Sequence, residues 1–323
     1  MEQQATRLNL RAPAKINLTL KILGKRADGY HELETLMQKI ALFDELELRL
    51  IAEPGVRISC SCPNCPNCPD ADLPEDEDNI AVRAAQLFLK ETDNSGQGVN
   101  IVLRKNIPVA AGLGGGSSDA AAVINGLNRL LNTDCSLERR AEMAVQIGAD
   151  VPLFIYDFPA ALATGIGERL RPVPSLTGCR ILLINPGIPV STKWAYEAFS
   201  ARTGKIALTT EQKAFTFFCS EKCGQNNSSE QTAMKRFTVP DDLHNDLEAV
   251  TAERHRIIQE LKECLFSNGA AGAMMSGSGS TVFGLFHEKA GEQAEQCRSL
   301  LRQEYDQVYL VSPLQENQEE QGR

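Results

Sequence analysis

The strongest chemical signal in this sequence is a cluster of glycines followed by two serines and an aspartate. Four of the chain's 24 glycines stand at positions 112 and 114–116, and the polar residues behind them are Ser117, Ser118 and Asp119. Glycine lets a backbone adopt unusual dihedral angles and approach a bound group closely. Where such a loop enters a helix, free N–H groups and the helix dipole together favour an anion. The cluster therefore predicts a site for a phosphate or a similar anion.

The residues after the cluster predict the helix that such a site needs. Apolar side chains recur at spacings of three and four residues, as on one buried helix face, at Ala121, Ile124, Leu127, Leu130 and Leu131. We expect Ser117 or Ser118 as the N-cap. Asp119 then lies in the first turn, where the helix dipole favours negative charge.

Two better-known phosphate loops do not fit this pattern. A P-loop requires a lysine after its last glycine, and no lysine follows here. A dinucleotide-binding loop requires a third glycine where Ser117 stands, and Pro108 interrupts the approach from the preceding strand. The non-functional alternative is a flexible glycine turn before a core helix.

Two charged residues next to turns are candidates for acid–base chemistry. Asp150 stands in a short turn between a predicted helix and the apolar residues 152–155. A carboxylate held there can act as a base or can simply cap the turn. Lys15 follows an Ala-Pro-Ala interruption of the alternating residues 8–23. Judged from that segment alone, Lys15 is typical of a solvated strand lysine.

Residues 59–78 form a loop rich in proline, asparagine and acidic residues, and they contain Cys60, Cys62, Cys65 and Cys68. Zinc prefers four sulfur ligands, but structural zinc sites usually take their two halves from separated places. An iron–sulfur site is a further alternative, although the usual ending of that motif is absent. The third alternative is an inert surface insertion. We expect it on a hairpin tip remote from the anion site, so that replacing all four cysteines hardly changes activity.

The composition sets outer limits on function. The chain has 323 residues, is 42% hydrophobic, and carries a net charge of -9. This acidic balance argues against nucleic acid as a partner. No run of 18 apolar residues is present, which argues against a membrane partner, and the N-terminus lacks the apolar stretch of a secretory signal. We therefore expect a cytoplasmic protein whose ten cysteines are reduced thiols or metal ligands.

Periodicity predicts an alternation of strands and helices along the chain. Strands are expected at residues 8–23, 33–51, 99–103, 180–185 and 305–311, and helices at 79–90, 121–131, 137–146, 191–199, 245–266 and 288–304. A second glycine–serine loop lies within residues 269–284 and is followed by a strand. Residues 200–240 are polar and poorly patterned, and the tail from residue 314 is expected to be disordered.

These motifs occur together, and in this order, in one known family. Residues 108–118 resemble the glycine-rich signature of the GHMP kinases, residues 275–283 resemble its third motif, and residues 13–18 its first. The resemblance implies an α+β two-domain fold. The N-terminal domain would be similar to ribosomal protein S5 domain 2 and span residues 1–172, with the Cys-rich insertion 59–78. A ferredoxin-like C-terminal domain would span 173–313, with the polar insertion 200–240 and the tail 314–323.

The resemblance also implies roles for particular residues. Lys15 and Asp150 match the catalytic lysine and aspartate, where the lysine would keep the aspartate ionised for its work on a hydroxyl. Mg²⁺ would bridge the phosphate oxygens of ATP. The ATP itself would lie over Pro108, Val109, Ala110, Ala111, Gly112, Leu113, Gly114, Gly115, Gly116, Ser117 and Ser118.

Residues 26–31 and 147–152 narrow the resemblance. They are most similar to family members that phosphorylate the 2-hydroxyl of a cytidine-diphosphate-linked methylerythritol in the non-mevalonate isoprenoid pathway. The substrate-binding residues would be Asn17, Tyr30, His31 and Tyr196. The tyrosines would enclose the cytosine ring and the histidine would contact its edge, with Trp194 as an alternative stacking ring. The protein would be a monomer or a weak homodimer. The alternatives are a homoserine or mevalonate type of GHMP kinase and a non-catalytic nucleotide-binding module.

Overall fold

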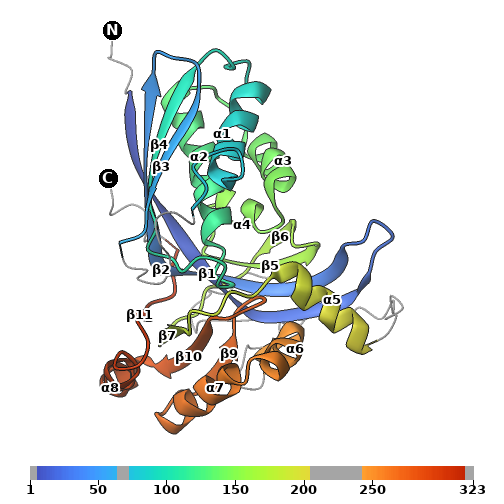
Figure 1. Cartoon of the computed structure of the whole chain (residues 1–323), viewed down its shortest axis with the longest axis vertical. Coiled ribbons are helices and arrows are strands. Elements are labelled where there is room, and N and C mark those ends of the chain that lie inside the picture. Colours follow the sequence, from blue (N-terminus) through green and yellow to red (C-terminus); the bar gives the residue numbers. More distant parts are fainter. Residues whose placement is uncertain (1–5, 64–72, 204–241, 317–323) are drawn as a thin grey trace, which may run out of the picture. The chain divides into compact units, whose positions relative to one another are not determined.

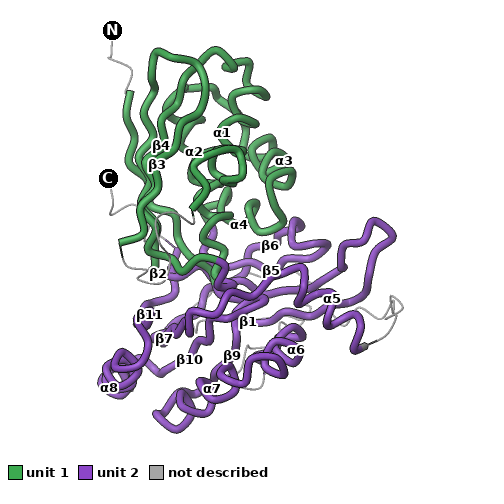
Figure 2. The backbone as a smooth tube through the Cα atoms, in the orientation of Figure 1, with its two compact units in different colours: residues 1–15, 42–109, 113–157 green, residues 16–41, 110–112, 158–323 purple. Residues whose placement is uncertain are grey.

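The computed structural model describes residues 6–63, 73–203 and 242–316, with the elements labelled in Figure 1. It contains two compact units, formed by residues 1–15, 42–109 and 113–157 and by residues 16–41, 110–112 and 158–323 (Figure 2). Strands β1 (Arg7–Lys25) and β2 (His31–Ile51) contribute residues to both units. The compact units are discontinuous in sequence. The domain boundary at 172/173 stays a prediction.

The first unit places helices on a small mixed sheet. Strand β4 (Gly98–Arg104) pairs antiparallel with residues 45–51 of β2 and parallel with β3 (Gly55–Ser61). Helix α2 packs against α1 and α4, and α3 packs against α4; their bounds are Ile80–Glu91 (α1), Gly115–Leu131 (α2), Leu137–Ile147 (α3) and Val151–Ile155 (α4). Gly126 allows α2 to approach the sheet, because a Cβ there would lie 2.5 Å from the Leu10 side chain.

The second unit contains a sheet with the strand order β11-β7-β10-β9. The chain runs through β7 (Cys179–Asn185), helices, β9 (Gly272–Met275), β10 (Val282–His287), helix α8 (Gly291–Leu301) and β11 (Gln307–Val311). Helices α7 (Ile257–Ser267) and α8 pack on this sheet. The order of strands and helices is that of the ferredoxin-like motif, so the predicted α+β fold with a ferredoxin-like C-terminal half is confirmed.

The remaining strands of the second unit pair directly or indirectly with the parts of β1 and β2 that belong to it, residues 16–41. Strand β5 (Ala160–Gly165) pairs antiparallel with residues 33–38 of β2, and β6 (Arg169–Pro172) pairs with β5. Strand β8 (His244–Asn245) pairs parallel with β1. Helix α5 spans Thr192–Thr203, and helix α6, which spans Asp246–Arg254, packs against it. None of the helices in the described ranges is long and apolar enough to cross a bilayer.

Local sequence signals explain where two helices begin. The Ser136 side chain accepts a hydrogen bond from Arg139 N at the start of α3, and Asn79 accepts one from Ala81 N at the start of α1. The predicted serine cap of α2 was wrong. Gly114, with φ of 70°, occupies that position, because glycine adopts this left-handed conformation at little cost. Helix α2 therefore begins earlier than expected, and the prediction that Asp119 lies in its first turn was wrong.

Two further predictions differ from the structure. The expected interruption of the first strand is absent, and β1 continues through Pro13 because extended backbone suits the fixed φ of proline. The single helix expected at residues 245–266 is two helices, α6 and α7, because the chain takes an extended conformation at His255. Most of the predicted insertion 200–240 and of the tail from 314 lies outside the described residues.

Candidate active site

The glycine-rich segment of the first unit packs tightly against its neighbours. A Cβ at Gly114 would lie 3.0 Å from Lys15 Cγ and 3.2 Å from Phe154 Cζ, and φ at this residue is 70°. Both facts favour glycine, since larger residues rarely adopt this φ and would collide. The sequence run of glycines thus reflects a close backbone approach and not only flexibility.

The start of α2 provides the N–H groups that the sequence predicted. The first intrahelical bond runs from Ser118 N to Gly114 O at 2.9 Å. The N–H groups of Gly115, Gly116 and Ser117 therefore have no partner within the helix. Together with the helix dipole they form a site suited to an anion such as a phosphate.

Lys15 and Asp150, far apart in sequence, form an ion pair beside this segment. Lys15 Nζ lies 3.3 Å from Asp150 Oδ2, and the side chains are 4% and 37% exposed, respectively. The backbone N–H of Lys15 donates to Leu113 O at 2.9 Å, which fixes the lysine against the glycine-rich segment. Asp150 directly precedes α4. The carboxylate is the accessible member of the pair, so it can contact a bound hydroxyl.

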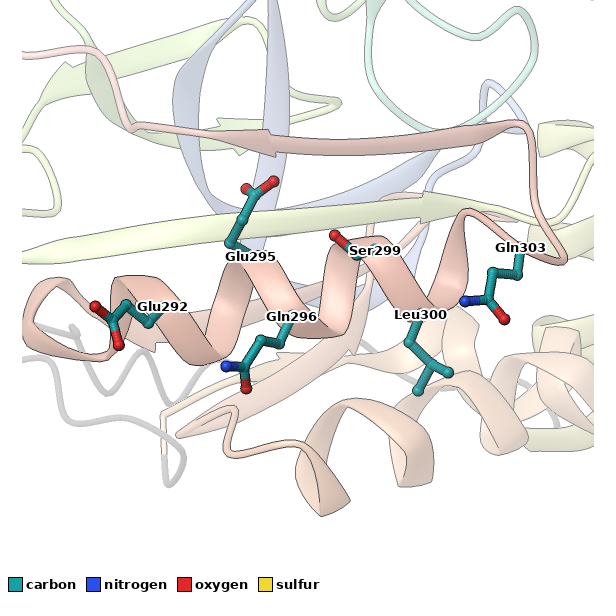
Figure 3. Close-up of a pocket in the computed structure, with 6 residues that line it drawn as sticks. All are labelled: Glu292, Glu295, Gln296, Ser299, Leu300 and Gln303. Atoms are coloured by element: carbon teal, nitrogen blue, oxygen red, sulfur yellow. The ribbon is translucent and has the colours of Figure 1, made fainter.

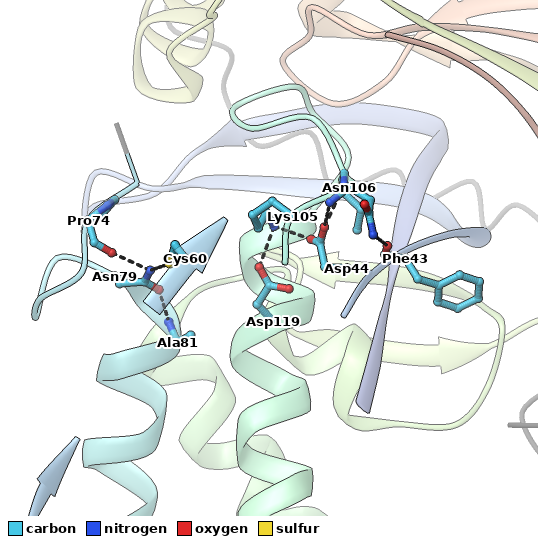
Figure 4. Close-up of polar contacts among 10 residues, drawn as sticks. Phe43, Asp44, Cys60, Pro74, Asn79, Ala81, Lys105, Asn106 and Asp119 are labelled. Atoms are coloured by element: carbon cyan, nitrogen blue, oxygen red, sulfur yellow. Dashed lines mark hydrogen bonds and ion pairs between the residues drawn. The ribbon is translucent and has the colours of Figure 1, made fainter. Parts of the chain in front are cut away.

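A buried charge cluster, which we call the Lys105 triad, lies under the first turn of α2. It consists of Lys105, Asp44 and Asp119, and Lys105 Nζ pairs with both carboxylates, at 2.6 Å from Asp119 Oδ2 (Figure 4). A Cβ at Gly115 would lie 3.1 Å from Lys105 Nζ. The ammonium group is therefore in contact with the residue at which the helix begins.

The two carboxylates of the triad have different surroundings. Asp44 Oδ1 accepts hydrogen bonds from the backbone N–H groups of Asn106 and Ile107, at 2.6 and 2.8 Å. Asp119 Oδ1 has no hydrogen-bond partner among the described residues. Burial raises the pKa of Asp119 to about 8; repulsion from Asp44 adds to this, while Lys105 opposes it. The pKa of Asp119 therefore lies well above that of an exposed aspartate.

Lys105 remains charged in this position. Burial by itself would lower its pKa, but the carboxylates of Asp119 and Asp44 outweigh that effect and raise it. The charged lysine compensates the negative charge of the carboxylates beside it, which reduces the cost of burying the triad.

Cys60 lies at the end of β3, near this triad. Asn79 Nδ2 is 3.6 Å from its Sγ (Figure 4). Burial raises the pKa of the thiol to about 11, and the carboxylates of Glu75 and Asp119 add to the shift. The predicted position on a remote hairpin tip was wrong for Cys60, because β3 pairs in parallel with β4 and leads to α1. Cys62 is buried. The remaining two cysteines of the predicted cluster lie outside the described residues, so metal binding stays a prediction.

In the second unit, the loop of residues 276–281 packs against the beginning of the glycine-rich segment. Ser276 Oγ donates to Gly112 O at 2.9 Å and accepts from Asn17 N at 3.3 Å. The Asn17 side chain is buried, and its amide donates to Thr35 Oγ1 at 2.8 Å. Two sequence motifs about 160 residues apart are thus joined directly. Substrate binding by Asn17 stays a prediction.

Two of the predicted base-binding rings lie together. The rings of His31 and Tyr196 stack with centroids 5.1 Å apart. Ser200 Oγ donates to Tyr196 O at 2.9 Å and therefore accepts from His31 Nε2 at 2.7 Å. Burial, and to a lesser degree Lys25, lowers the pKa of His31. The ring is neutral at pH 7, so its Nδ1 is an acceptor.

The two other predicted rings are in different surroundings. Tyr30 is 60% exposed and follows the Asp28-Gly29 turn, in which Asp28 Oδ1 accepts from Tyr30 N at 3.0 Å. The Trp194 ring packs against the Arg254 guanidinium group, 4.5 Å from its centroid, and against the His255 ring. Tyr196 and Trp194 are therefore both engaged by neighbouring side chains, and stacking of either ring on a base stays a prediction.

A groove of about 510 Å³ lies along α8 and contains none of these residues. Its lining side chains all extend from α8 or the residues just after it, as Figure 3 shows: Glu292, Glu295, Gln296, Ser299, Leu300 and Gln303. Two carboxylates and no basic group line it, so it does not suit a phosphorylated ligand.

Sequence reasoning missed the Lys105 triad. Lys105 lies two residues before Ile107, in a segment that resembles an ordinary strand end, and Asp44 lies in an alternating strand. The only available signal was Asp119 at a helix start, which we interpreted as a favourable dipole contact. A buried lysine cannot be distinguished from a solvated one by sequence spacing.

Comparisons with known proteins agree with this geometry. The family model for the GHMP kinases N terminal domain matches residues 79–158, and the model for the GHMP kinases C terminal matches residues 232–303. A protein of Desulfotalea psychrophila named 4-diphosphocytidyl-2-C-methyl-D-erythritol kinase is 45% identical over 314 residues, which cover 96% of this chain and 97% of that protein. A protein of the same name from Citrifermentans bemidjiense is 44% identical and covers 88% of this chain and 91% of its own length.

Solved structures show the same fold. A crystal structure of 4-(cytidine 5'-diphospho)-2C-methyl-D-erythritol kinase has a TM-score of 0.69 at 28% identity, covering 95% of this chain and 99% of that one. A homoserine kinase from Cytophaga hutchinsonii has a TM-score of 0.67 at 19% identity, with 98% of each chain covered. The similarity to the homoserine kinase concerns the fold alone.

Proposed function

Because this chain belongs to the GHMP kinase family, in its branch of 4-diphosphocytidyl-2-C-methyl-D-erythritol kinases, we propose that it phosphorylates the 2-hydroxyl of 4-diphosphocytidyl-2-C-methyl-D-erythritol with ATP. The relatives match nearly the whole chain at 44–45% identity. This similarity favours the cytidylyl alcohol over homoserine or mevalonate, and a catalytic protein over a nucleotide-binding module. We further propose a cytoplasmic location and a monomer or weak homodimer.

The observation that carries the proposal is the Lys15–Asp150 ion pair beside the start of α2. Phosphoryl transfer needs positioning and charge compensation more than covalent catalysis. Asp150 Oδ atoms would accept the proton of the attacking hydroxyl and orient its oxygen. The Lys15 ammonium group, 3.3 Å away, would compensate the negative charge that collects on this carboxylate and on the attacking oxygen.

The residues present fit the phosphates of ATP. Gly114 and Gly115 occupy positions where a Cβ would meet other atoms at 3.0 Å, so a larger residue would displace the backbone at the start of α2. The N–H groups of Gly115, Gly116 and Ser117 would hold the phosphate oxygens. The predicted ATP-binding residues 108–118 include this segment, and their individual roles are part of the proposal.

The residues present also fit Mg²⁺. Protein sites for this ion often consist of one or two oxygen ligands, with substrate phosphates and water completing the octahedron. Ser118 Oγ and Asp119 Oδ1 are buried oxygen atoms near the start of α2 without a partner among the described residues. We propose them as the candidate ligands; binding of the ion there would displace the proton that the raised pKa of Asp119 favours. When bound, the ion would neutralise charge on the phosphates.

Recognition of cytosine would rest on the aromatic residues of the second unit. Tyr30 and Tyr196 would stack on the base, and stacking tolerates any base. The Nδ1 acceptor of neutral His31 matches the exocyclic amine of cytosine, which is a donor, whereas uracil presents an oxygen there. The stacked tyrosines would therefore provide affinity, and His31 would provide the preference for cytosine.

A panel assay tests the proposed function directly. Purified protein is supplied with ATP and one alcohol at a time: the cytidylyl methylerythritol, its uridylyl analogue, homoserine or mevalonate. We expect ADP release and a new phosphomonoester, detected by mass spectrometry, with the cytidylyl compound. Turnover of homoserine or mevalonate in its place would refute the proposal.

Replacing Tyr30 by Ala is expected to raise KM for the cytidylyl substrate by about 10- to 100-fold, the worth of one stacking contact on a base. KM for ATP should remain nearly unchanged, because Tyr30 is exposed and contributes little to the core. Steady-state kinetics with each substrate varied in turn provides the measurement. Tyr30→Phe, which keeps the ring, is the matched control. An equal loss for both substrates would place Tyr30 in a structural role.

Replacing Cys60, Cys62, Cys65 and Cys68 together by Ser is expected to leave kcat within about threefold, as for most loop insertions. Burial raises the pKa of Cys60 to about 11, so its thiol is protonated at pH 7 and a poor nucleophile. Cys135→Ser, outside the insertion, is the control. Stoichiometric zinc in the purified wild type that disappears in the variant would show that the insertion is a metal site.

A further inference from the structure

The side-chain amide of Asn245 forms hydrogen bonds through both its nitrogen and its oxygen within the second unit. Its Nδ2 donates two hydrogen bonds, each 2.8 Å long, to Met275 O and Gly277 O. Its Oδ1 accepts from Leu247 N at 3.0 Å and so caps α6. The residue is buried on β8, where its backbone pairs with Leu20 of β1. One side chain thus connects a helix start to the loop that follows β9.

The two carbonyl groups that Asn245 holds lie on either side of Ser276. The Ser276 hydroxyl in turn donates to Gly112 O at 2.9 Å. The backbones of Gly112 and Ser276 are in contact here, since a Cβ at Gly112 would lie 2.1 Å from Ser276 O. Asn245 therefore sets the position of the residue that contacts the first glycine of the glycine-rich segment.

The same face of α6 holds the loop at two further points. Glu248 Oε2 accepts from Met275 N at 2.8 Å, and Thr251 Oγ1 donates to Ser278 O at 3.3 Å. Asn245, Glu248 and Thr251 are spaced three residues apart, so they lie along one side of the helix. Of residues 275–278, from the end of β9 into the loop, all except Ser276 are thereby bound through their backbone to this side of α6. Ser276 is left to contact Gly112.

We propose that Asn245 is a positioning residue for phosphoryl transfer. By fixing both neighbours of Ser276, it holds the loop against Gly112 and so maintains the conformation of the glycine-rich segment that receives ATP. The inference rests on the proposed function in one respect, namely that this segment binds the phosphates of ATP. Asn245 itself touches neither substrate nor phosphate.

Asn245→Asp separates this role from the helix cap. The carboxylate keeps the acceptor for Leu247 N, so α6 retains its N-cap, but both donors to the loop carbonyls are lost. We expect KM for ATP, and the dissociation constant of a non-hydrolysable ATP analogue, to rise by about 10-fold or more, because two hydrogen bonds are replaced by repulsion. KM for the cytidylyl substrate should stay within about twofold.

A matched control distinguishes positioning from loss of stability. Asn268 also donates through its Nδ2 to a backbone carbonyl, Cys264 O at 2.8 Å, but at the end of α7 and away from the loop. Asn268→Asp should lower the melting temperature and leave both ATP constants unchanged. Unchanged ATP constants in a folded Asn245→Asp protein would overturn the proposal, whatever the effect on stability.

A double-mutant cycle tests the route through Ser276. Asn245→Ser keeps a capping hydroxyl without adding charge and serves where Asn245→Asp does not fold. We compare the fold-increase in the dissociation constant of the analogue for Asn245→Ser, for Ser276→Ala and for the double variant. If Asn245 acts through Ser276, the fold-increase of the double variant should be clearly smaller than the product of the two single fold-increases. Fully multiplicative effects would contradict the inference.

Binding of the analogue is measured without turnover. The Asn245 proposal can therefore be refuted independently of the proposed kinase function. A wild type that binds the analogue but phosphorylates none of the alcohols refutes the proposed function and leaves the Asn245 test intact. A wild type that does not bind the analogue removes the premise of both, and the Asn245 proposal falls with it.

Discussion

Replacing Asp150 by Asn is expected to lower kcat by about 10²- to 10⁴-fold, the usual contribution of a positioned acid–base group. Asparagine has the same shape but cannot take up the proton of the attacking hydroxyl. Affinity for ATP should hardly change, because the start of α2 is built from backbone groups. The measurement is single-turnover kinetics at saturating concentrations of both substrates, combined with thermal unfolding to show that the variant is folded.

Asp157 provides the control for this substitution. It is an exposed aspartate of the same unit, a few residues further along the chain. Asp157→Asn should therefore leave kcat unchanged within about twofold, as most surface substitutions do. If Asp150→Asn instead turns over at a rate near that of the wild type, Asp150 is only a turn residue before α4.

Replacing Lys105 by Met is expected to destabilise the protein by about 3–5 kcal/mol, because removal of one partner leaves buried carboxylates without compensation. Lys105 and both carboxylates are fully or almost fully buried. Urea unfolding of the two proteins at one pH gives the difference in the free energy of unfolding. Lys90→Met, at an exposed position in the last turn of α1, is the control and should cost little.

The origin of this loss can be tested by removing the charges as well. Adding Asp44→Asn and Asp119→Asn to Lys105→Met should restore most of the stability, since no uncompensated charge remains and the amides keep similar shapes. A loss below about 1 kcal/mol for Lys105→Met alone would mean that the triad contributes no more than an exposed ion pair.

The triad also predicts how stability depends on pH. The pKa of Asp119 is raised from 3.8 to about 8 on folding, so the folded state holds this proton more tightly than the unfolded state. The contribution of Asp119 to the free energy of unfolding therefore decreases as pH rises through this window. Asp119→Asn should reduce that decrease in urea unfolding between about pH 5 and pH 7.

Much of the architecture follows from signals within a few residues of each other. The caps Asn79 and Ser136 mark the starts of α1 and α3, and the spacing of apolar residues predicts α2. The glycine-rich segment predicts an anion site because glycine dihedrals and a helix start are local properties of the chain. Local signals failed at His255, where an extended backbone separates α6 from α7 although the apolar spacing continues through both helices.

The sequence by itself determined the family, the α+β class and the residues that could do chemistry, because those are properties of residue types in order. Only the tertiary structure decided which of them meet. Lys15 and Asp150 pair across 135 positions, Lys105 joins carboxylates 61 positions before and 14 after it, and Asn245 holds carbonyls 30 and 32 positions away. Each contact depends on how strands and helices pack, and a lysine or asparagine on its own carries no sign of the partner it will be buried against.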